Sequence, residues 1–358
     1  MASRDDPEQA RPVKPPDPMD PEHSSADDVI RELTAQSLPF GRVIDFGDPD
    51  GPVDILGDDV TRTPHGFLVG LVTPEQRTAL DEALESLRSA FAFSLSDLTG
   101  YTGIAGPFQV TPPGVDAPSG STIVKQRRMS PRDIDIADEN LVPLRDAGII
   151  ERCYLYDHGA NLVVAAKKDA LTGAWTDKRV CQDFRPVNLL TPSDKHSLPL
   201  PEQLHQAVGS SRFLTKIDLR SGFHQIPIPE DRRHLTAFWW NGELWQYARA
   251  PFGLKNMPSH FQRIMDQAIK GAGLGKCCQC YLDDLLIHSD SFDQHLVDVR
   301  RALEMLIANG LRAHPQKSIV CAQVLEYLGH NISFHGISPN EAEVAAIRAL
   351  HAPPISKS

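Results

Sequence analysis

The chain has 358 residues and a formal net charge of −11, from 36 Lys and Arg against 47 Asp and Glu. Residues 1–117 hold 8 basic and 21 acidic residues, whereas residues 118–358 hold 28 and 26, so the overall charge does not exclude nucleic acid as a ligand of the main body. Six cysteines in so long a chain exclude a disulfide scaffold. No secretory signal is evident and no apolar run reaches the about 18 residues of a membrane span. We therefore expect an intracellular protein, cytoplasmic or nuclear, with no membrane partner.

The N-terminal third is expected to contain little regular structure. Residues 1–65 are acidic and rich in proline, which predicts disorder for most of this segment, with a short helix around Ala26–Leu33. Residues 66–120 are predicted to be a linker with one helix, which begins at the capping box Thr73-Pro74-Glu75-Gln76. The apolar residues of that helix recur at three-and-four spacing: Leu80, Leu84, Leu87 and Phe91.

Residues 121–335 carry mixed helix and strand signals without a regular βαβ alternation, which predicts an α+β domain. Helices are expected from Ser130 to Gly148, from about Ser259, and over Phe292–Asn309. Strands are expected at Asn161–Ala166, Lys178–Asp183, Phe213–Asp218 and Glu326–Phe334. Residues 336–358 are expected to be a truncated connection to a further subdomain.

Two adjacent carboxylates, Asp283 and Asp284, lie between two apolar strand-like runs, Cys277–Cys280 and Leu285–Ile287. This pattern predicts a β-hairpin whose two-residue turn is the Asp pair. Two hard oxygen ligands presented together suit Mg²⁺, although a solvated polar turn is the alternative. The cysteines of the first run are predicted to be small apolar strand residues, not zinc ligands.

Asp218 ends the predicted strand Phe213–Asp218, immediately before a turn that contains glycine. Alone, an Asp at this position is usually a turn residue. Together with Asp283 and Asp284 it predicts a three-carboxylate site drawn from two segments. Such a site can hold two divalent ions about 4 Å apart and promote phosphoryl transfer by position and charge.

From about Val124 to Ser333 the chain resembles the reverse transcriptase of gypsy-class LTR retrotransposons, and more distantly the retroviral polymerases. The matching motifs occur in the family's order: Lys167-Lys168-Asp169, Arg179 to Asn188, Asp218 to Ile226, Pro251 to Asn256, Tyr281 to Asp284 and Tyr327 to His330. The resemblance implies a right-hand polymerase fold with fingers and palm, and with the thumb largely missing. It also implies an RNA-directed DNA polymerase that uses two Mg²⁺ ions, or Mn²⁺, with a primed RNA or DNA template and dNTPs as partners.

The resemblance also assigns roles to individual residues. Asp218 and Asp283 would be the principal metal ligands, with Asp284 completing the cluster. The expected nucleotide-binding residues are Lys167 or Lys168, Arg179, Phe223 beneath the sugar, Gly253 beside the nascent base pair, and Lys317 as a proton donor to pyrophosphate. The expected primer and template residues are Arg185, Asn188, Tyr327, Leu328 and Gly329. Ordinary core packing remains the alternative for Phe223, a solvated loop for the basic residues, and a purely structural role for Arg185 and Asn188.

The chain departs from the family at Gln182 and Ser318, neither of which touches the carboxylates, and at its C-terminal end. The resemblance places the thumb, RNase H, protease and integrase elsewhere or counts them as lost, and it predicts poor processivity. Two other functions remain open: a non-catalytic or domesticated fragment that binds nucleic acid or protein, and an RNA-dependent RNA polymerase. The second is disfavoured by Phe223 and by the Tyr-Leu that precedes Asp283.

Overall fold

The computed structural model describes residues 61–63, 66–112, 114–116, 120–168, 175–209 and 211–339. The helix expected at Ala26–Leu33, most of the acidic segment and almost all of the predicted C-terminal connection lie outside these residues. Residues 61 and 62, within the segment predicted to be disordered, form a short strand because they pair with Leu68–Val69. None of the helices among the described residues is long and apolar enough to cross a membrane.

The main sheet has six strands in the order β1-β2-β13-β8-β12-β11. Its strands are β1 (Thr61–Arg62), β2 (Leu68–Val69), β8 (Phe213–Asp218), β11 (Cys278–Tyr281), β12 (Asp284–Ser289) and β13 (Ile319–Ala322). The central strand β8 is antiparallel to both neighbours, β12 and β13, while β2 joins the far side of β13 in parallel. The strand that ends at Asp218 is therefore enclosed by two strands from later in the chain.

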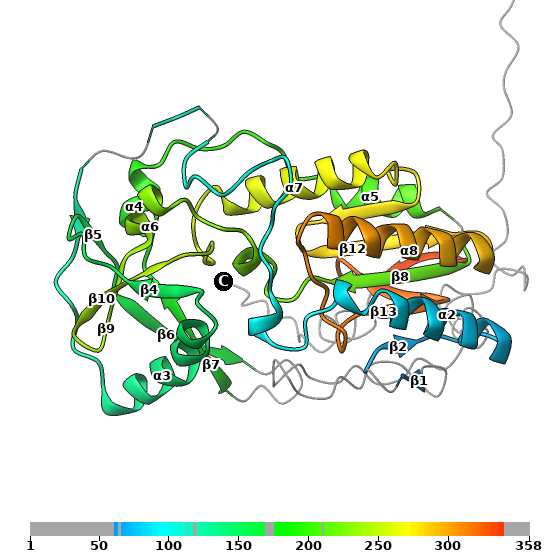
Figure 1. Ribbon diagram of the computed structural model, residues 1–358, viewed down its shortest axis with the longest axis horizontal. Helices are drawn as coiled ribbons and strands as arrows, with labels where there is room; N and C mark the ends of the chain where they lie inside the picture. The colour runs from blue at the N-terminus through cyan, green and yellow to red at the C-terminus, as the bar shows by residue number, and fades with distance from the viewer. Residues whose placement is uncertain are drawn as a thin grey trace, which may run out of the picture. The chain divides into compact units, whose positions relative to one another are not determined.

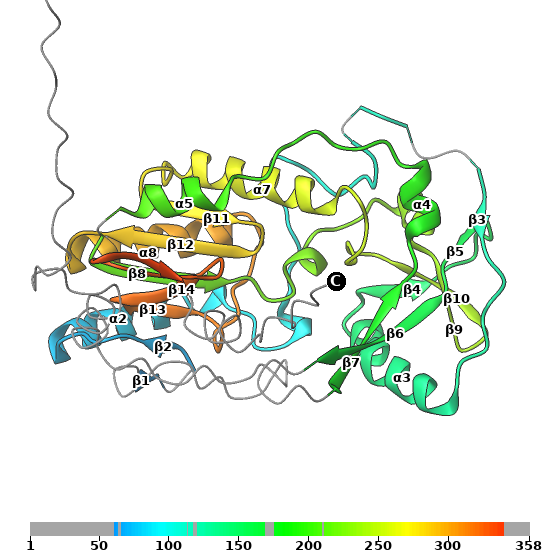
Figure 2. The same ribbon diagram turned by 180° about the vertical axis from the view of Figure 1, so that it is seen from behind.

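Helices cover both faces of this sheet. They are α2 (Pro74–Ser86), α5 (Pro201–Val208), α7 (Met257–Gly271) and α8 (Phe292–Ala308). Helix α8 packs on β8 and β12, and α2 packs on α8, on the face seen in Figure 1. The opposite view in Figure 2 shows α5 and the strand β14 (Val324–Tyr327) on the other face. The apolar residues predicted for α7 are all buried, as the periodicity indicated: Phe261, Ile264, Met265, Ala268 and Ile269.

The predicted capping box at the start of α2 is confirmed. Thr73 Oγ1 accepts a hydrogen bond from the Gln76 amide at 3.3 Å, and Gln76 Oε1 accepts one from the Thr73 amide at 3.0 Å. The helix ends at Ser86, so Phe91, predicted to lie on its apolar stripe, is outside it. Phe91 instead bridges to Ala313 and packs on another ring of the core, because the chain turns through a 3-10 helix after α2.

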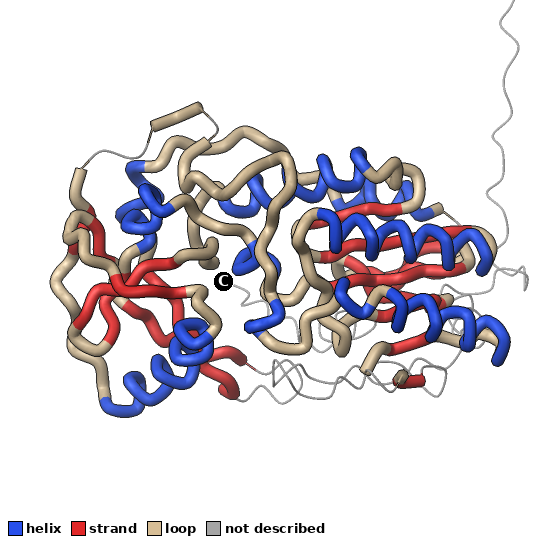
Figure 3. Tube along the Cα trace, in the orientation of Figure 1, coloured by secondary structure: helices blue, strands red, loops and turns tan. Residues whose placement is uncertain are grey.

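A second group of strands, drawn in red like those of the main sheet in Figure 3, forms three small sheets. It comprises β3 (Thr122–Ile123), β4 (Ile150–Arg152), β5 (His158–Gly159), β6 (Leu162–Lys168), β7 (Trp175–Gln182), β9 (Phe238–Trp240) and β10 (Glu243–Tyr247). Its helices are α3 (Pro131–Asp146), α4 (Arg185–Leu190) and α6 (Glu230–Arg233). Helix α3 packs against β4, β6 and β7. Short 3-10 helices span Arg88–Ala90, Leu95–Asp97, Gly222–Gln225 and His234–Thr236.

Two predictions need comment. The predicted strand Glu326–Phe334 is wrong, because this segment folds back on itself as a hairpin of β14 and β15 (His330–Ser333), extended by β16 (Gly336–Pro339). The turn residues Leu328 and Gly329 both have positive φ, as the two-residue type I′ turn requires. The segment predicted to be a linker after residue 66 contributes buried side chains to the main core, among them Phe67, Leu80 and Phe108.

Candidate active site

The hairpin β11–β12 carries the two adjacent carboxylates, but its turn lies one residue earlier than predicted. Tyr281 pairs with Asp284, so the two-residue turn is Leu282-Asp283, and Asp284 is the first residue of β12. Leu282 has a φ of 55°, in the left-handed region that favours glycine. A positive φ at the first turn position is the feature of a type II′ turn. A leucine in this conformation is strained, so its surroundings must hold the turn.

The three predicted carboxylates come together at the edge shared by β8 and β12. Asp218 pairs directly with Asp284 across the two strands, so both side chains point to the same face. The Asp283 carbonyl accepts a hydrogen bond from the Leu219 amide at 3.2 Å, which ties the turn to the end of β8. A Cβ at Gly222 would lie 3.0 Å from the Cβ of Asp283, so the close approach of these segments requires glycine there.

The electrostatics of this cluster favour added positive charge. Burial raises the pKa of Asp218 to about 7, the Lys317 ammonium opposes this shift, and the charges of the two neighbouring carboxylates add to it. Burial also raises the pKa of Asp283, and the Asp284 charge raises it further. A carboxylate pKa above its ordinary range means that ionised oxygens lack compensation. The cluster is therefore suited to bind cations.

One lysine that the sequence reasoning did not single out compensates part of this charge. Lys216 Nζ lies 3.3 Å from Asp284 Oδ1. The same ammonium lowers the pKa of both Asp218 and Asp283. The signal was present in the sequence, because Lys216 precedes Asp218 by two residues in a strand and so shares its face.

The donor set fits a divalent metal by the chemistry of its oxygen atoms. No three His, Cys, Asp or Glu side chains in the described ranges are placed so as to hold a metal ion. Within the predicted set of three, Asp284 is engaged by Lys216. Asp218 and Asp283 have the raised pKa values of poorly compensated carboxylates. Hard carboxylate oxygens with excess negative charge are the ligands that Mg²⁺ prefers.

Phe223 lies beside the carboxylates in the 3-10 helix Gly222–Gln225. Its side chain is 9% exposed and packs between two rings, with centroid distances of 4.9 Å to Phe252 and 5.4 Å to Phe261. Phe252 is 57% exposed. Phe223 is thus largely a core residue. The small exposed part of its side chain lies next to the exposed ring of Phe252.

The segment that contains Gly253 is held by Asn188. Asn188 Nδ2 donates to the Gly253 carbonyl at 2.8 Å, and Asn188 Oδ1 accepts from the Lys255 amide at 2.9 Å. Gly253 has a φ of 88°, and a Cβ there would make only ordinary contact with its surroundings, so the backbone conformation is what requires glycine. Arg185 forms a two-pronged ion pair with Asp183, with both N–O distances 2.7 Å.

The remaining predicted residues fall in two places. Tyr327 is fully buried, and its hydroxyl donates to the Asp284 carbonyl at 3.3 Å, so the hairpin β14–β15 contacts β12 directly. Lys317 lies in the turn before β13, near Asp218. Lys167, Lys168 and Arg179 lie on the two-stranded ribbon β6–β7, where Arg179 is exposed and pairs with Ala165. The structure therefore groups Tyr327 and Lys317 with the carboxylates and places the other three basic residues on a separate sheet.

Comparison with known proteins gives a consistent result. Residues 166–332 match the family model described as reverse transcriptase (RNA-dependent DNA polymerase). The chain is 34% identical over 177 residues to the retrovirus-related Pol polyprotein from transposon gypsy of Drosophila melanogaster, which is 49% of this chain and 17% of that protein. It is 34% identical over 214 residues to the corresponding polyprotein from transposon 297 of the same species, 60% of this chain and 20% of that protein. The chain thus spans at most about a fifth of these relatives.

Solved structures of foamy viral protease-reverse transcriptase share the fold. The complex with RNA/DNA hybrid has a TM-score of 0.67 at 19% identity, and covers 79% of this chain and 36% of the viral chain. The complex with double-stranded DNA has the same score, identity and coverage of this chain, with 56% of the viral chain covered. This likeness confirms the mixed α+β architecture and the right-hand polymerase fold that the sequence predicts.

Proposed function

We propose that this chain, which carries a reverse transcriptase domain of the gypsy retrotransposon class over residues 166–332, is an RNA-directed DNA polymerase. The observation that supports this most directly is the pairing of Asp218 with Asp284 across β8 and β12, with Asp283 tied to the end of β8. Residues 121–335 would form the fingers and palm. The polymerase would extend a primer on an RNA or DNA template.

In this mechanism Asp218 and Asp283 would hold the divalent cations, with Mg²⁺ as the expected ion and Mn²⁺ as a substitute. Bound there, the cations supply charge neutralisation to the attacking primer hydroxyl and to the departing pyrophosphate. Lys216 holds Asp284 and reduces repulsion within the cluster. Asp218 and Asp283 are both half-buried, so their surroundings would restrict water around them only in part.

The nucleotide would lie against the chain's own aromatic and basic residues. The exposed edge of Phe223, fixed by its two aromatic neighbours, would exclude a 2′-hydroxyl and so select deoxynucleotides. The triphosphate would be held by Arg179 and by one of Lys167 and Lys168. Lys317, whose ammonium acts on the pKa of Asp218, would donate a proton to pyrophosphate.

The hairpin β14–β15 would support the primer terminus. Its turn is Leu328-Gly329, and its Tyr327 hydroxyl donates to the Asp284 carbonyl. This contact would fix the distance between the primer end and the carboxylates. The bonds of Asn188 to the Gly253 loop support a bracing role for this residue in place of direct template contact.

Primer extension on an RNA template with dNTPs and Mg²⁺ tests the proposal, beside an Asp283→Asn variant. We expect extension by the wild-type chain and its loss in the variant. Comparison of dNTPs with rNTPs in the same assay separates this function from RNA-directed RNA synthesis. The Phe223→Val variant should show a smaller preference for dNTPs over rNTPs than the wild-type chain. A folded wild-type chain that binds a primed template without extending it would overturn the proposal in favour of a non-catalytic nucleic-acid-binding fragment.

A further inference from the structure

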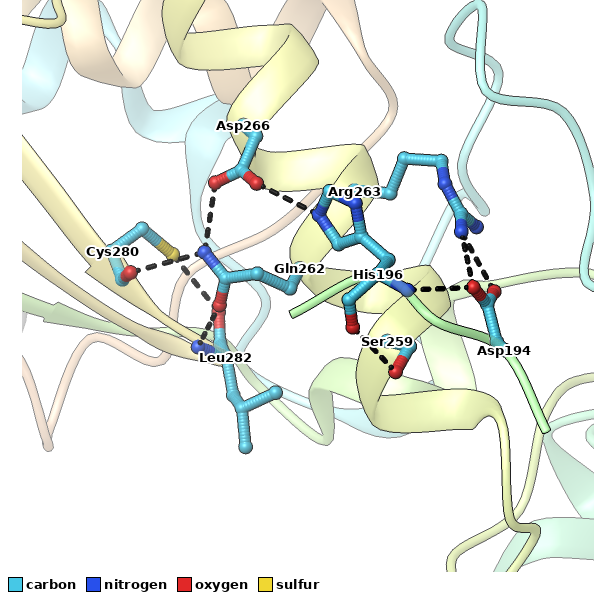
Figure 4. Close-up of polar contacts among 8 residues, drawn as sticks. All are labelled: Asp194, His196, Ser259, Gln262, Arg263, Asp266, Cys280 and Leu282. Atoms are coloured by element: carbon cyan, nitrogen blue, oxygen red, sulfur yellow. Dashed lines mark hydrogen bonds and ion pairs between the residues drawn. The ribbon is translucent and has the colours of Figure 1, made fainter. Parts of the chain in front are cut away.

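The turn that carries Asp283 is held by one side chain of its own strand β11 and by one from helix α7. Leu282 has the left-handed backbone conformation described above, so its two peptide groups need partners to keep it in place. Its amide donates to Gln262 Oε1 at 2.9 Å, and its carbonyl accepts from the Cys280 thiol at 3.0 Å. Both backbone polar groups of this residue are thus bound to side chains, as Figure 4 shows.

Gln262 is the centre of this arrangement. It lies on α7 and is 1% exposed. Its Oε1 accepts from the Leu282 amide, and its Nε2 donates to the Cys280 carbonyl at 3.1 Å and to Asp266 Oδ1 at 2.8 Å. One buried amide therefore contacts both the end of β11 and the first residue of the turn, and its orientation is fixed, since the acceptor must face Leu282 and the donor must face Cys280.

A second layer of contacts fixes Gln262 in turn. Asp266 lies one helical turn further along α7, and its Oδ2 is 3.0 Å from His196 Nε2, within hydrogen-bond distance. His196 belongs to the segment between α4 and α5, which Arg263 holds through a two-pronged pair with Asp194 at 2.7 and 2.8 Å. The Ser259 hydroxyl donates to the carbonyl of His196 at 3.1 Å. The contacts in Figure 4 therefore form a continuous chain from this segment, through α7, to the turn.

We propose that Gln262 is a positioning residue that fixes the place of Asp283 by holding the strained turn, with Asp266 supporting it. This inference rests on the proposed function, since Asp283 matters there as a metal ligand. Residues that orient metal ligands through hydrogen bonds change metal affinity or activity by roughly 10- to 100-fold when removed. Loss of Gln262 should therefore weaken divalent-cation binding without removing any ligand.

Three variants test this at different points of the chain of contacts. Gln262→Leu keeps the volume and removes all three hydrogen bonds. Gln262→Glu keeps an acceptor for the Leu282 amide but places negative charge against the Cys280 carbonyl and Asp266. Asp266→Asn leaves both bonds between Gln262 and the turn intact, so its effect should be the smallest. His295→Leu is the matched control, because this buried side chain on α8 also makes two hydrogen bonds, to Thr215 and Ser289, away from the turn.

The first readout is the rise in melting temperature on titration with Mg²⁺, which reports cation binding without requiring catalysis. The second is the Mg²⁺ concentration for half-maximal primer extension. We expect Gln262→Leu to raise the required Mg²⁺ concentration by about tenfold in both, with Asp266→Asn between it and wild type and His295→Leu unchanged. Equal Mg²⁺ requirements in Gln262→Leu and wild type, or an equal shift in the control, would overturn the inference.

The two readouts also separate this inference from the proposed function. A wild-type chain that Mg²⁺ stabilises but that does not extend a primer would refute the polymerase and still allow the positioning role to be measured by melting. A wild-type chain with neither response would overturn both.

Discussion

Replacing Asp218 by Asn should inactivate the enzyme and make the metal-free protein more stable at alkaline pH. Burial and the neighbouring carboxylates raise the pKa of Asp218 from 3.8 to about 7 in the folded chain. Between these values the folded state keeps a proton that the unfolded state has lost, so wild-type stability falls as pH rises. The stabilising contribution of protonated Asp218 is complete below about pH 4 and is lost as the pH passes about 7. The amide of the Asp218→Asn variant does not titrate and would show no such dependence.

The size of the effect follows from the shift in pKa. A rise of about three units corresponds to about 4 kcal/mol at about 1.4 kcal/mol per unit, which is the ceiling for a single independent group. The charges of Asp284 and Asp283 supply part of the rise at Asp218, so the contribution of Asp218 itself is smaller than this ceiling. We therefore expect a difference of about 2 kcal/mol, or about 4 to 8 °C in melting temperature for a domain of this size.

The assay is thermal unfolding of wild type and Asp218→Asn in EDTA at about pH 4.5 and about pH 8.5, which bracket most of the titration. The melting temperature of the variant should exceed that of wild type only slightly at the acidic pH and by several degrees at the alkaline pH. Addition of Mg²⁺ should reverse it, since cations stabilise the wild-type cluster. A variant that is less stable than wild type at alkaline pH in EDTA, or a difference that does not vary with pH, would refute this account of the site.

Three further predictions follow from contacts around the same carboxylates. Gly222→Ala should lower the free energy of unfolding by about 1 to 3 kcal/mol and remove most of the primer-extension activity, because the new Cβ would lie 3.0 Å from the Cβ of Asp283. A variant that melts at the wild-type temperature and extends primers fully would contradict this. Lys216→Met removes an ammonium that lowers the pKa of Asp218 and Asp283, so the acidic limb of the pH–activity profile should move to higher pH. An acidic limb at the wild-type pH would contradict this role of Lys216. Tyr327→Phe removes the hydroxyl that donates to the Asp284 carbonyl. Its free energy of unfolding in urea should be about 1 kcal/mol lower than that of wild type, and an unchanged value would show that this hydrogen bond does not stabilise the fold.

Local patterns predicted the elements that surround the site well, and tertiary contacts account for most of what they missed. The capping box at Thr73 and the apolar stripe of α7 gave correct helix starts and faces, because both depend on neighbours a few residues apart. The strand Phe213–Asp218 has the predicted bounds. The hairpin turn was displaced by one residue because Asp is common in turns and Leu at a positive φ is not, and only the contacts of Gln262 and Cys280 make the latter acceptable.

The supporting residues of the site were harder to foresee than its ligands. Lys216 could have been found from strand alternation. Gln262 and Asp266 are four residues apart on a helix whose buried face is mostly apolar, which is a weak signal. Their partners, Leu282 and His196, are distant in the sequence, so no local pattern contains these contacts.

The place of β8 at the centre of the sheet has a consequence for synthesis on the ribosome. Its partners β12 and β13 begin at residues 284 and 319, so the strand is made well before either can pair with it. Until then it presents a strand with three apolar residues among its six and with two unpaired edges, the kind of segment that associates with other nascent chains. Lys216 interrupts this run with a charge, which disfavours such association. The lysine that compensates the charge of the finished cluster would thus also protect β8 from association before β12 and β13 pair with it.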